Sequence, residues 1–202
     1  LLDPGFEEAR HLYGIFLFHW NRMEEAEAEL TRTLEIDPLL AAAHQTFGRL
    51  HLSMRRPDQA ITHLREAVTL EPMFSLAHAH LGHAYLQKEM PTEAITEFEA
   101  GARIGSPSDK AHLAYGYARV GRHEDAKAIL ANLVSPGNYP PPFHMALAYV
   151  GLADHNEAFR WLEQAREEHA PWLITVNVDR AFDPLRVDSR FGDIVRSMEL
   201  AP

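Results

Sequence analysis

Histidine is the residue type in this sequence best suited to chemistry, because 13 of the 202 residues are histidines. His78, His80 and His83 lie close together, and His44 and His51 precede them along the chain. A zinc site needs three or four ligands that converge at about 2.0–2.1 Å. His80 and His83 are three residues apart, so they would share one face of a helix. A metal site at these histidines is therefore one hypothesis to weigh.

Other signatures of catalysis are absent from the sequence. It contains no His-Glu-x-x-His stretch, no Gly-x-Ser-x-Gly turn and no glycine-rich phosphate loop, since residues 101–106 lack the required lysine. Acidic pairs such as Glu24-Glu25 are typical of a solvated helix face. The absence of cysteine excludes disulfides, thiolate metal sites and cysteine nucleophiles. The sequence therefore predicts a protein that is not an enzyme and has no cofactor.

Charge and hydropathy narrow the class of partner. The formal net charge is −10, which disfavours nucleic acids because their non-specific binding depends on neutralisation of phosphates by Lys and Arg. Acidic membrane surfaces are disfavoured for the same reason. No apolar run approaches the roughly 20 residues that a membrane-spanning helix needs. A protein or peptide partner remains, and we expect no membrane insertion and no nucleic-acid binding by this segment.

The elements that would position any site are set by an internal repeat. Pro4, Pro38 and Pro72 are each separated by 34 residues, and each follows an acidic residue. Alanines recur at the same period, shortening to 32 residues in the second half of the chain: Ala26, Ala60, Ala94, Ala126 and Ala158. Four residues after each alanine comes a large apolar residue, and twelve residues before it comes glycine or alanine. This pattern predicts helical hairpins in which a small residue lets two helices approach closely.

The repeat resembles the tetratricopeptide repeat (TPR) family over about residues 6–170. The third repeat reads Leu81-Gly82-x2-Tyr85 and then Ala94-x3-Phe98, which matches the family pattern. The sequence departs from that pattern at the early tryptophan, which is replaced by Arg10, His44, His78, Lys110 and Pro142. The last two repeats also lack a closing proline in register. A helical hairpin array of another family is the alternative.

The resemblance changes the interpretation of the histidines. His44 and His78 occupy the slot where the family places a packing aromatic side chain. His51 occupies the slot that Tyr85, Tyr117 and Tyr149 fill in later repeats. Core or partly buried packing positions are thus favoured over metal ligands, and we expect no metal site.

The implied fold is all-α, a right-handed superhelical solenoid of five helix-turn-helix repeats with a C-terminal capping helix. The repeats are expected at about 6–38, 40–72, 74–106, 107–138 and 139–170. Paired helices are expected at 6–19 and 23–36, 40–53 and 57–70, 74–87 and 91–104, 108–120 and 123–134, and 141–152 and 155–168. Residues 1–5 would be the end of a truncated upstream repeat, because Asp3-Pro4 repeats the ending Asp37-Pro38.

Residues 171–202 carry no repeat signature and would form the cap. We expect a short helix near 171–177, an irregular turn at 182–186 and a last helix at about 189–199. The final helix of a solenoid has an apolar face without a neighbour. Residues that could cover it are Phe182, Leu185, Phe191, Ile194, Val195 and Met198. Phe182-Asp183-Pro184-Leu185-Arg186 is similar to the tail that follows such repeats in bacterial multidomain signalling proteins.

In this family the first helices of the repeats line a concave groove, which the resemblance makes the candidate site for a partner. The expected groove residues are His11, Ile15, Phe18, Arg49, Leu52, His83, Gln87, Tyr115, Arg119 and His144. For each of them, simple packing or solvent exposure is the alternative. One subset of the family binds acidic chaperone tails with a Lys/Asn/Arg clamp. This sequence has His11, Ile15, Thr46 and Leu76 at those positions, which disfavours that ligand.

Two functions follow from these observations. The first is a protein–protein interaction module that binds a peptide or helix of a partner in the groove, within a larger bacterial signalling or regulatory protein. The second is a structural or self-association segment, with Tyr13 and Leu17 partly uncovered at the N-terminal edge and able to mediate a homodimer. The expected compartment is the cytoplasm, with the periplasm as the alternative.

Overall fold

The computed structural model describes residues 7–198; the predicted remnant of an upstream repeat at residues 1–5 lies outside this range. Between residues 7 and 198 all regular secondary structure is helical and no strand is present, which confirms the predicted all-α fold. Ten helices pair into five consecutive hairpins: α1 (Glu7–His19) with α2 (Met23–Ile36), α3 (Ala41–Ser53) with α4 (Pro57–Leu70), α5 (Ser75–Gln87) with α6 (Pro91–Ile104), α7 (Pro107–Arg119) with α8 (His123–Leu133), and α9 (Pro142–Gly151) with α10 (His155–Glu167). Each of these helices begins and ends within one residue of its predicted bounds.

The start of α7 illustrates how local chemistry fixes a boundary. The sequence pattern predicted a start at residue 108, whereas α7 begins at Pro107. The Ser106 side chain accepts a hydrogen bond from the Asp109 amide, and the Asp109 carboxylate accepts one from the Ser106 amide. This capping box, followed by a proline at the first helical position, satisfies the free amides of the first turn.

Close packing inside each hairpin comes from the small residue in its first helix. A methyl group on Gly48 would lie 2.3 Å from Leu64 Cγ, and one on Gly82 would lie 2.8 Å from the Phe98 ring. Leu64 and Phe98 are almost completely buried. The predicted contact between a small residue and the large residue of the partner helix is therefore present in the structure.

The turn between the two helices of each hairpin contains a residue in the left-handed backbone region. Asn21, Arg55, Glu89, Gly121 and Ala153 occupy the same slot, with φ between 56° and 85°. This conformation closes the end of a helix tightly and is easy for glycine only. The slot is occupied by glycine in the fourth hairpin alone among the five.

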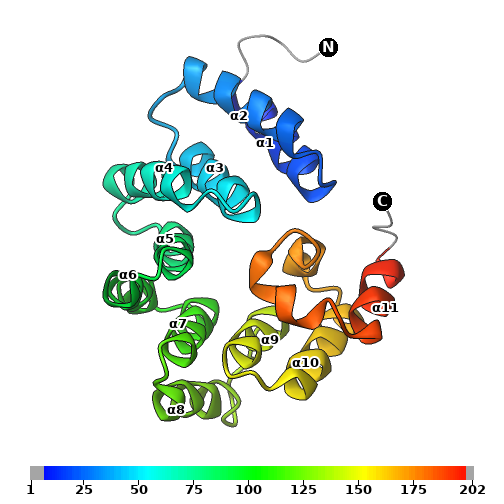
Figure 1. The fold of residues 1–202 in the computed structure, drawn as a ribbon. Coiled ribbons are helices and arrows are strands. Elements are labelled where there is room, and N and C mark those ends of the chain that lie inside the picture. Colours follow the sequence, from blue (N-terminus) through cyan, green and yellow to red (C-terminus); the bar gives the residue numbers. More distant parts are fainter. Residues whose placement is uncertain (1–6, 199–202) are drawn as a thin grey trace.

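The hairpins follow one another around an arc, and the C-terminal segment folds back into it (Figure 1). Residues 171–198 form a 3-10 helix η1 (Pro171–Thr175), a second 3-10 helix η2 (Arg180–Leu185) and α11 (Ser189–Ser197). We call these residues the tail. The prediction of an irregular turn at residues 182–186 was wrong in part, because residues up to Leu185 belong to η2. Asp179 caps η2 by accepting a hydrogen bond from the Ala181 amide.

The tail packs first against the last hairpin. Phe182, Leu185, Phe191 and Ile194 are buried in the same apolar core as α9 and α10. The Phe182 ring lies 5.2 Å from the Phe143 ring, measured between centroids. The tail thus covers the end of the hairpin array, as a cap would, but it also extends farther along the inner face. None of the helices between residues 7 and 198 combines the length and the apolar character needed to cross a membrane.

Candidate functional site

A cavity of about 580 Å³ lies between the first helices of the hairpins and the tail. Its walls come from α3, α5, α7 and α9 on one side and from residues 172–184 of the tail on the other. Cavities of this size are typical of sites that take a small molecule or several side chains of a peptide. The tail therefore encloses the inner face without filling it.

Eight of the ten predicted groove residues line this cavity: Phe18, Arg49, Leu52, His83, Gln87, Tyr115, Arg119 and His144. His11 and Ile15 do not line it. His11 instead forms a 2.9 Å hydrogen bond with the Thr46 hydroxyl, which ties α1 to α3. Ile15 is partly buried on α1. The sequence thus located the inner face well, while contact of these residues with a partner stays a prediction.

Arg49 is the unusual charged group of the cavity. Its Nη2 donates a 2.6 Å hydrogen bond to Nε2 of His19, and its guanidinium stacks on Phe18 at 4.6 Å from the ring centroid. Its Nε atom is buried and has no hydrogen-bond partner among residues 7–198. No carboxylate in that range lies within 4 Å of it, and burial lowers the pKa of Arg49 to about 10. A partly buried cation without a bonded acid is costly, so this part of the cavity favours an acidic group.

A second feature is a chain of four histidines from three first helices. His80 and His83 of α5, His112 of α7 and His144 of α9 have neighbouring rings 5.1–6.5 Å apart. Nε2 of His83 and Nδ1 of His112 are hydrogen-bonded at 3.2 Å, and Gln45 donates to His80. Burial lowers the pKa of all four, to about 3 for His83 and about 4 for His144. At neutral pH these side chains are uncharged packing groups.

The histidines do not converge as metal ligands. In the part of the chain that the structure describes, no group of three or more His, Asp or Glu side chains is arranged to hold a metal ion. His51, one of the histidines expected at a packing position, is 3% exposed and stacks edge-on against Phe47. His44 forms hydrogen bonds with His63 and with the Pro38 carbonyl, which also describes a structural role.

Tyr115 and Arg119 form the polar part of the cavity wall on α7. Arg119 donates a 2.7 Å hydrogen bond to the Tyr115 hydroxyl, and its guanidinium lies 5.6 Å from the tyrosine ring centroid. Tyr115 is buried, and burial raises its pKa to about 12. Arg119 itself is exposed and, within residues 7–198, forms no ion pair with a carboxylate. Gln87 of α5 is also exposed and donates to the Leu52 carbonyl.

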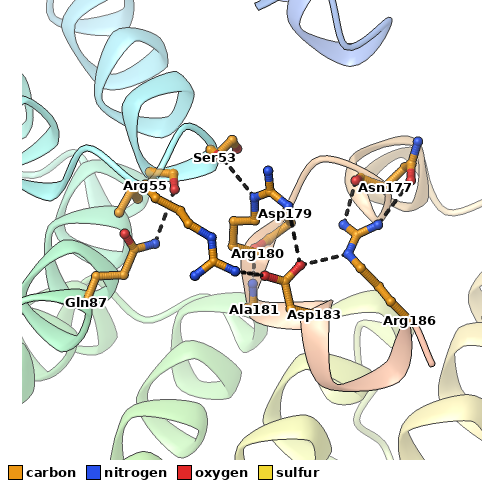
Figure 2. A network of polar contacts seen from close by, with 10 residues as sticks. Ser53, Arg55, Gln87, Asn177, Asp179, Arg180, Ala181, Asp183 and Arg186 are labelled. Atoms are coloured by element: carbon orange, nitrogen blue, oxygen red, sulfur yellow. Dashed lines mark hydrogen bonds and ion pairs between the residues drawn. The ribbon is translucent and has the colours of Figure 1, made fainter. Parts of the chain in front are cut away.

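The tail crosses the cavity and reaches the second hairpin. Figure 2 shows Arg180 donating to the Ser53 carbonyl at 2.8 Å and Arg55 pairing with Asp183 at 2.7 Å. Asp183 also accepts from Arg186, whose guanidinium is further bonded to Asn177. We call residues 176–183, which bridge the last hairpin and the second one, the clasp.

Apolar and charged contacts accompany these bonds. Val178 is 3% exposed and belongs to the apolar cluster of the first two hairpins, with Leu17, Phe18, Phe47 and Leu50. The Asp179 carboxyl lies near Arg49; burial raises the pKa of Asp179, and the positive charge of Arg49 opposes that shift.

The sequence pattern missed the clasp as part of the site. It assigned the tail only to covering the last helix, since a contact between residues more than 120 apart has no periodic signal. The only sequence indication was the charged, proline-containing stretch around Asp183, which lies outside the repeat.

Comparisons with known proteins agree with this architecture. Residues 46–110 match the family model of the tetratricopeptide repeat. No curated protein sequence matches the chain.

Solved structures with similar folds include TTC0263, a TPR protein of Thermus thermophilus, with 19% identity, a TM-score of 0.66, and coverage of 87% of this chain and 98% of that one. YrrB, described as a TPR protein with an unusual peptide-binding site, has 14% identity, a TM-score of 0.54, and coverage of 96% and 93%. MamA has 21% identity, a TM-score of 0.54, and coverage of 77% and 94%. At these identities the likeness concerns the fold alone.

Proposed function

Because residues 46–110 match the tetratricopeptide-repeat family and the chain has the fold of such proteins, we propose that it is a protein–protein interaction module. Its inner face binds a peptide or helix of a partner protein, as part of a larger bacterial signalling or regulatory protein. The observation that carries this proposal is the 580 Å³ cavity whose wall contains two arginines without ion-paired carboxylates among residues 7–198, Arg49 and Arg119. A peptide-binding site in the similar structure YrrB is consistent with a peptide ligand.

Arg119 is the residue with which to test the proposal. Its side chain is exposed on the cavity wall, so reversing its charge changes the surface offered to a partner without burying a new charge. Arg49 is a poorer choice, because an acidic residue at its partly buried position would destabilise the fold. Lys127 of α8 is a matched control, since it belongs to the same hairpin, is exposed and lies away from the cavity.

The experiment compares affinity capture by immobilised wild-type chain, Arg119→Glu and Lys127→Glu, with quantification of captured proteins by mass spectrometry. The proposal requires a protein that wild type and Lys127→Glu retain equally and that Arg119→Glu retains at least about tenfold less, the effect of losing one charge-assisted contact. Equal recovery on all three would show that the inner face is not the binding surface.

Self-association is a second candidate function, supported by exposed aromatic side chains of α1 at the N-terminal edge of the array. Tyr13, Phe16 and Trp20 are 39–52% exposed and stacked in a row, with Phe16 and Trp20 rings 4.4 Å apart. The equivalent of Phe16 in the next hairpin, Leu50, is completely buried. Leu17, which was expected to be partly uncovered, is buried, so only Tyr13 of that predicted pair contributes to the face. Sedimentation velocity over a hundredfold concentration range, with Phe16→Glu as the variant, would reveal a dimer or eliminate this function.

A further inference from the structure

The clasp lies where a ligand of the inner face would lie. It lines the cavity together with residues of α3, α5 and α7, and it lies close to three of the groove residues predicted from the sequence. Val178 belongs to the same buried apolar cluster as Phe18, and the Asp179 carboxyl is near enough to Arg49 and Tyr115 for its charge to act on the pKa of each. The chain thus presents its own segment to the surface that the proposed function assigns to a partner.

The fit of this segment is incomplete. A pocket of about 580 Å³, partly open to solvent, remains beside the clasp. Arg49 keeps a buried Nε without a partner, and its charge has no carboxylate within bonding distance among residues 7–198. A segment that extended an acidic side chain to Arg49 would satisfy the groove better than the clasp does.

The two ends of the clasp are held unequally. At the last hairpin, Phe182 and Leu185 are completely buried, and Arg186 is bonded to Asp183 and to Asn177. At the second hairpin, the polar attachment consists of the Arg180 bond to Ser53 and the Arg55–Asp183 pair, whose arginines are 41% and 70% exposed. Exposed ion pairs contribute little to stability. At this end one apolar side chain, Val178, is buried with the first two hairpins, so the clasp would release at α3 first and remain anchored at α9.

From these contacts we propose that the clasp is a resident ligand of the inner face, which a partner segment of the same chemistry replaces. That chemistry is an aliphatic side chain for the pocket of Phe18, Phe47 and Leu50, followed by acidic side chains for Arg49 and Arg55. The inference rests on the proposed function, because it assumes that the inner face is the binding surface. It adds what the face recognises and how access to it is controlled.

Opening of the clasp can be measured without knowing the partner, because the chain contains no cysteine. Ser53→Cys places a single thiol beneath the clasp, at a position that is 3% exposed. Thr33→Cys places a control thiol at a buried position in α2. In each reporter chain the two attachments are removed together by Arg55→Ala and Arg180→Ala, and the rate of reaction with a small disulfide reagent is recorded.

We expect the thiol at 53 to react about five- to tenfold faster when the attachments are removed, while the thiol at 33 is unaffected. Equal acceleration at both positions would mean general unfolding, and no acceleration at 53 would mean a permanent structural element. Either result would overturn the proposal. Neither result would affect the Arg119→Glu capture experiment, so the clasp proposal can be refuted while the proposed function stands, and the reverse.

Replacement is then tested with a synthetic peptide of residues 174–187, carrying a fluorophore, added to the 202-residue chain. It should bind a chain carrying Arg180→Ala and Asp183→Asn, which loosen the resident clasp but keep Arg55, at least about fivefold more tightly than wild type, because the resident competitor is weakened. A peptide with Asp179→Lys and Asp183→Lys is the control and should not bind. Absence of binding, or equal binding of the two peptides, would refute the clasp as a ligand even if it opens.

Discussion

Arg55 and Asp183 are 128 residues apart in the sequence and form a 2.7 Å ion pair that joins the end of α3 to η2. The pair is asymmetric in its surroundings. Arg55 is 70% exposed and, among residues 7–198, has this one acidic partner, whereas Asp183 is also within 4 Å of Arg180 and Arg186. Asp183 is therefore the centre of a small charge network, and Arg55 is its outermost member.

This asymmetry predicts unequal costs of removal. Arg55→Ala should lower the free energy of unfolding by less than about 1 kcal/mol, because an exposed pair is screened by solvent. Asp183→Ala should lower the free energy of unfolding by about 2 kcal/mol, since it also removes the acidic partner of Arg180 and Arg186. Urea denaturation of both single variants and the double variant gives the coupling energy directly. A larger loss for Arg55→Ala than for Asp183→Ala would contradict the network described here.

Two glycines in the same repeat slot should respond differently to alanine. At Gly48 the new methyl would overlap Leu64 at 2.3 Å, whereas at Gly14 the closest approach to Leu30 is 3.1 Å. We expect Gly48→Ala to destabilise the chain by about 1–2 kcal/mol, the overlap outweighing the better helix propensity. Gly14→Ala should change stability by less than about 0.5 kcal/mol. Urea midpoints measured side by side test the order, and a neutral Gly48→Ala would show that the first helix can shift away.

The left-handed turn residues provide a backbone test with an internal control. Ala153 has φ 58° and is exposed, so Ala153→Gly should stabilise the chain by about 1 kcal/mol through relief of strain. Gly121 occupies the same slot in the previous hairpin with open space around it, so Gly121→Ala should destabilise by a similar amount. Thermal melting of both variants would show shifts of opposite sign. Shifts of the same sign would mean that side-chain contacts, and not the positive φ, determine how a substitution at this turn position changes the melting temperature.

The buried histidines predict a stability that falls with acidity. The pKa values of His80, His83, His112 and His144 are lowered by burial in the folded chain, so the unfolded chain binds more protons below pH 6.5. Stability is complete above that pH and is lost as the pH falls from 6.5 toward the folded values, with each histidine contributing up to about 1.4 kcal/mol per pH unit. His78 opposes the trend, because its bond to Glu97 raises its pKa.

The measurement is urea unfolding at intervals between pH 7 and pH 5, above the range in which most carboxylates titrate. His144→Gln should reduce the pH dependence of the free energy of unfolding by up to roughly one proton, while the other buried histidines, among them His11, His19, His51 and His63, account for the dependence that remains. If the slope of the free energy of unfolding against pH is the same in wild type and His144→Gln, His144 is not held neutral by burial.

The repeat could be predicted from the sequence because its physics is local and periodic. Ala60, Leu64 and Gly48 mark one helix contact, and the same three roles recur in every hairpin, so the pattern defines both helices and their mutual packing. Most of the inner face, including Arg49, His83 and Tyr115, followed from the resemblance to the tetratricopeptide repeat family, in which the first helices line the groove. The early start of α7 required information from outside the period, namely the Ser106–Asp109 capping box.

What escaped prediction was the position of the tail across the inner face. Val178 and Asp179 belong to no repeat slot, and their partners on α1 and α3 are more than 120 residues away. Burial of Arg49 likewise depends on Trp172 and on the clasp above it, not on the helix that carries it. A pattern within one hairpin therefore identifies Arg49 as facing inward but gives no indication that it is enclosed.

The bond between Arg180 and Ser53 also changes how the molecule should come apart. In an ordinary linear array each unit touches only its neighbours, so terminal units fray independently and folding can start anywhere. Here the clasp holds the second unit to the C-terminal tail, closing a loop of well over a hundred residues. While the clasp is closed, the two ends of the array are coupled, so unfolding should be more cooperative than after Arg180→Ala and Arg55→Ala open the loop.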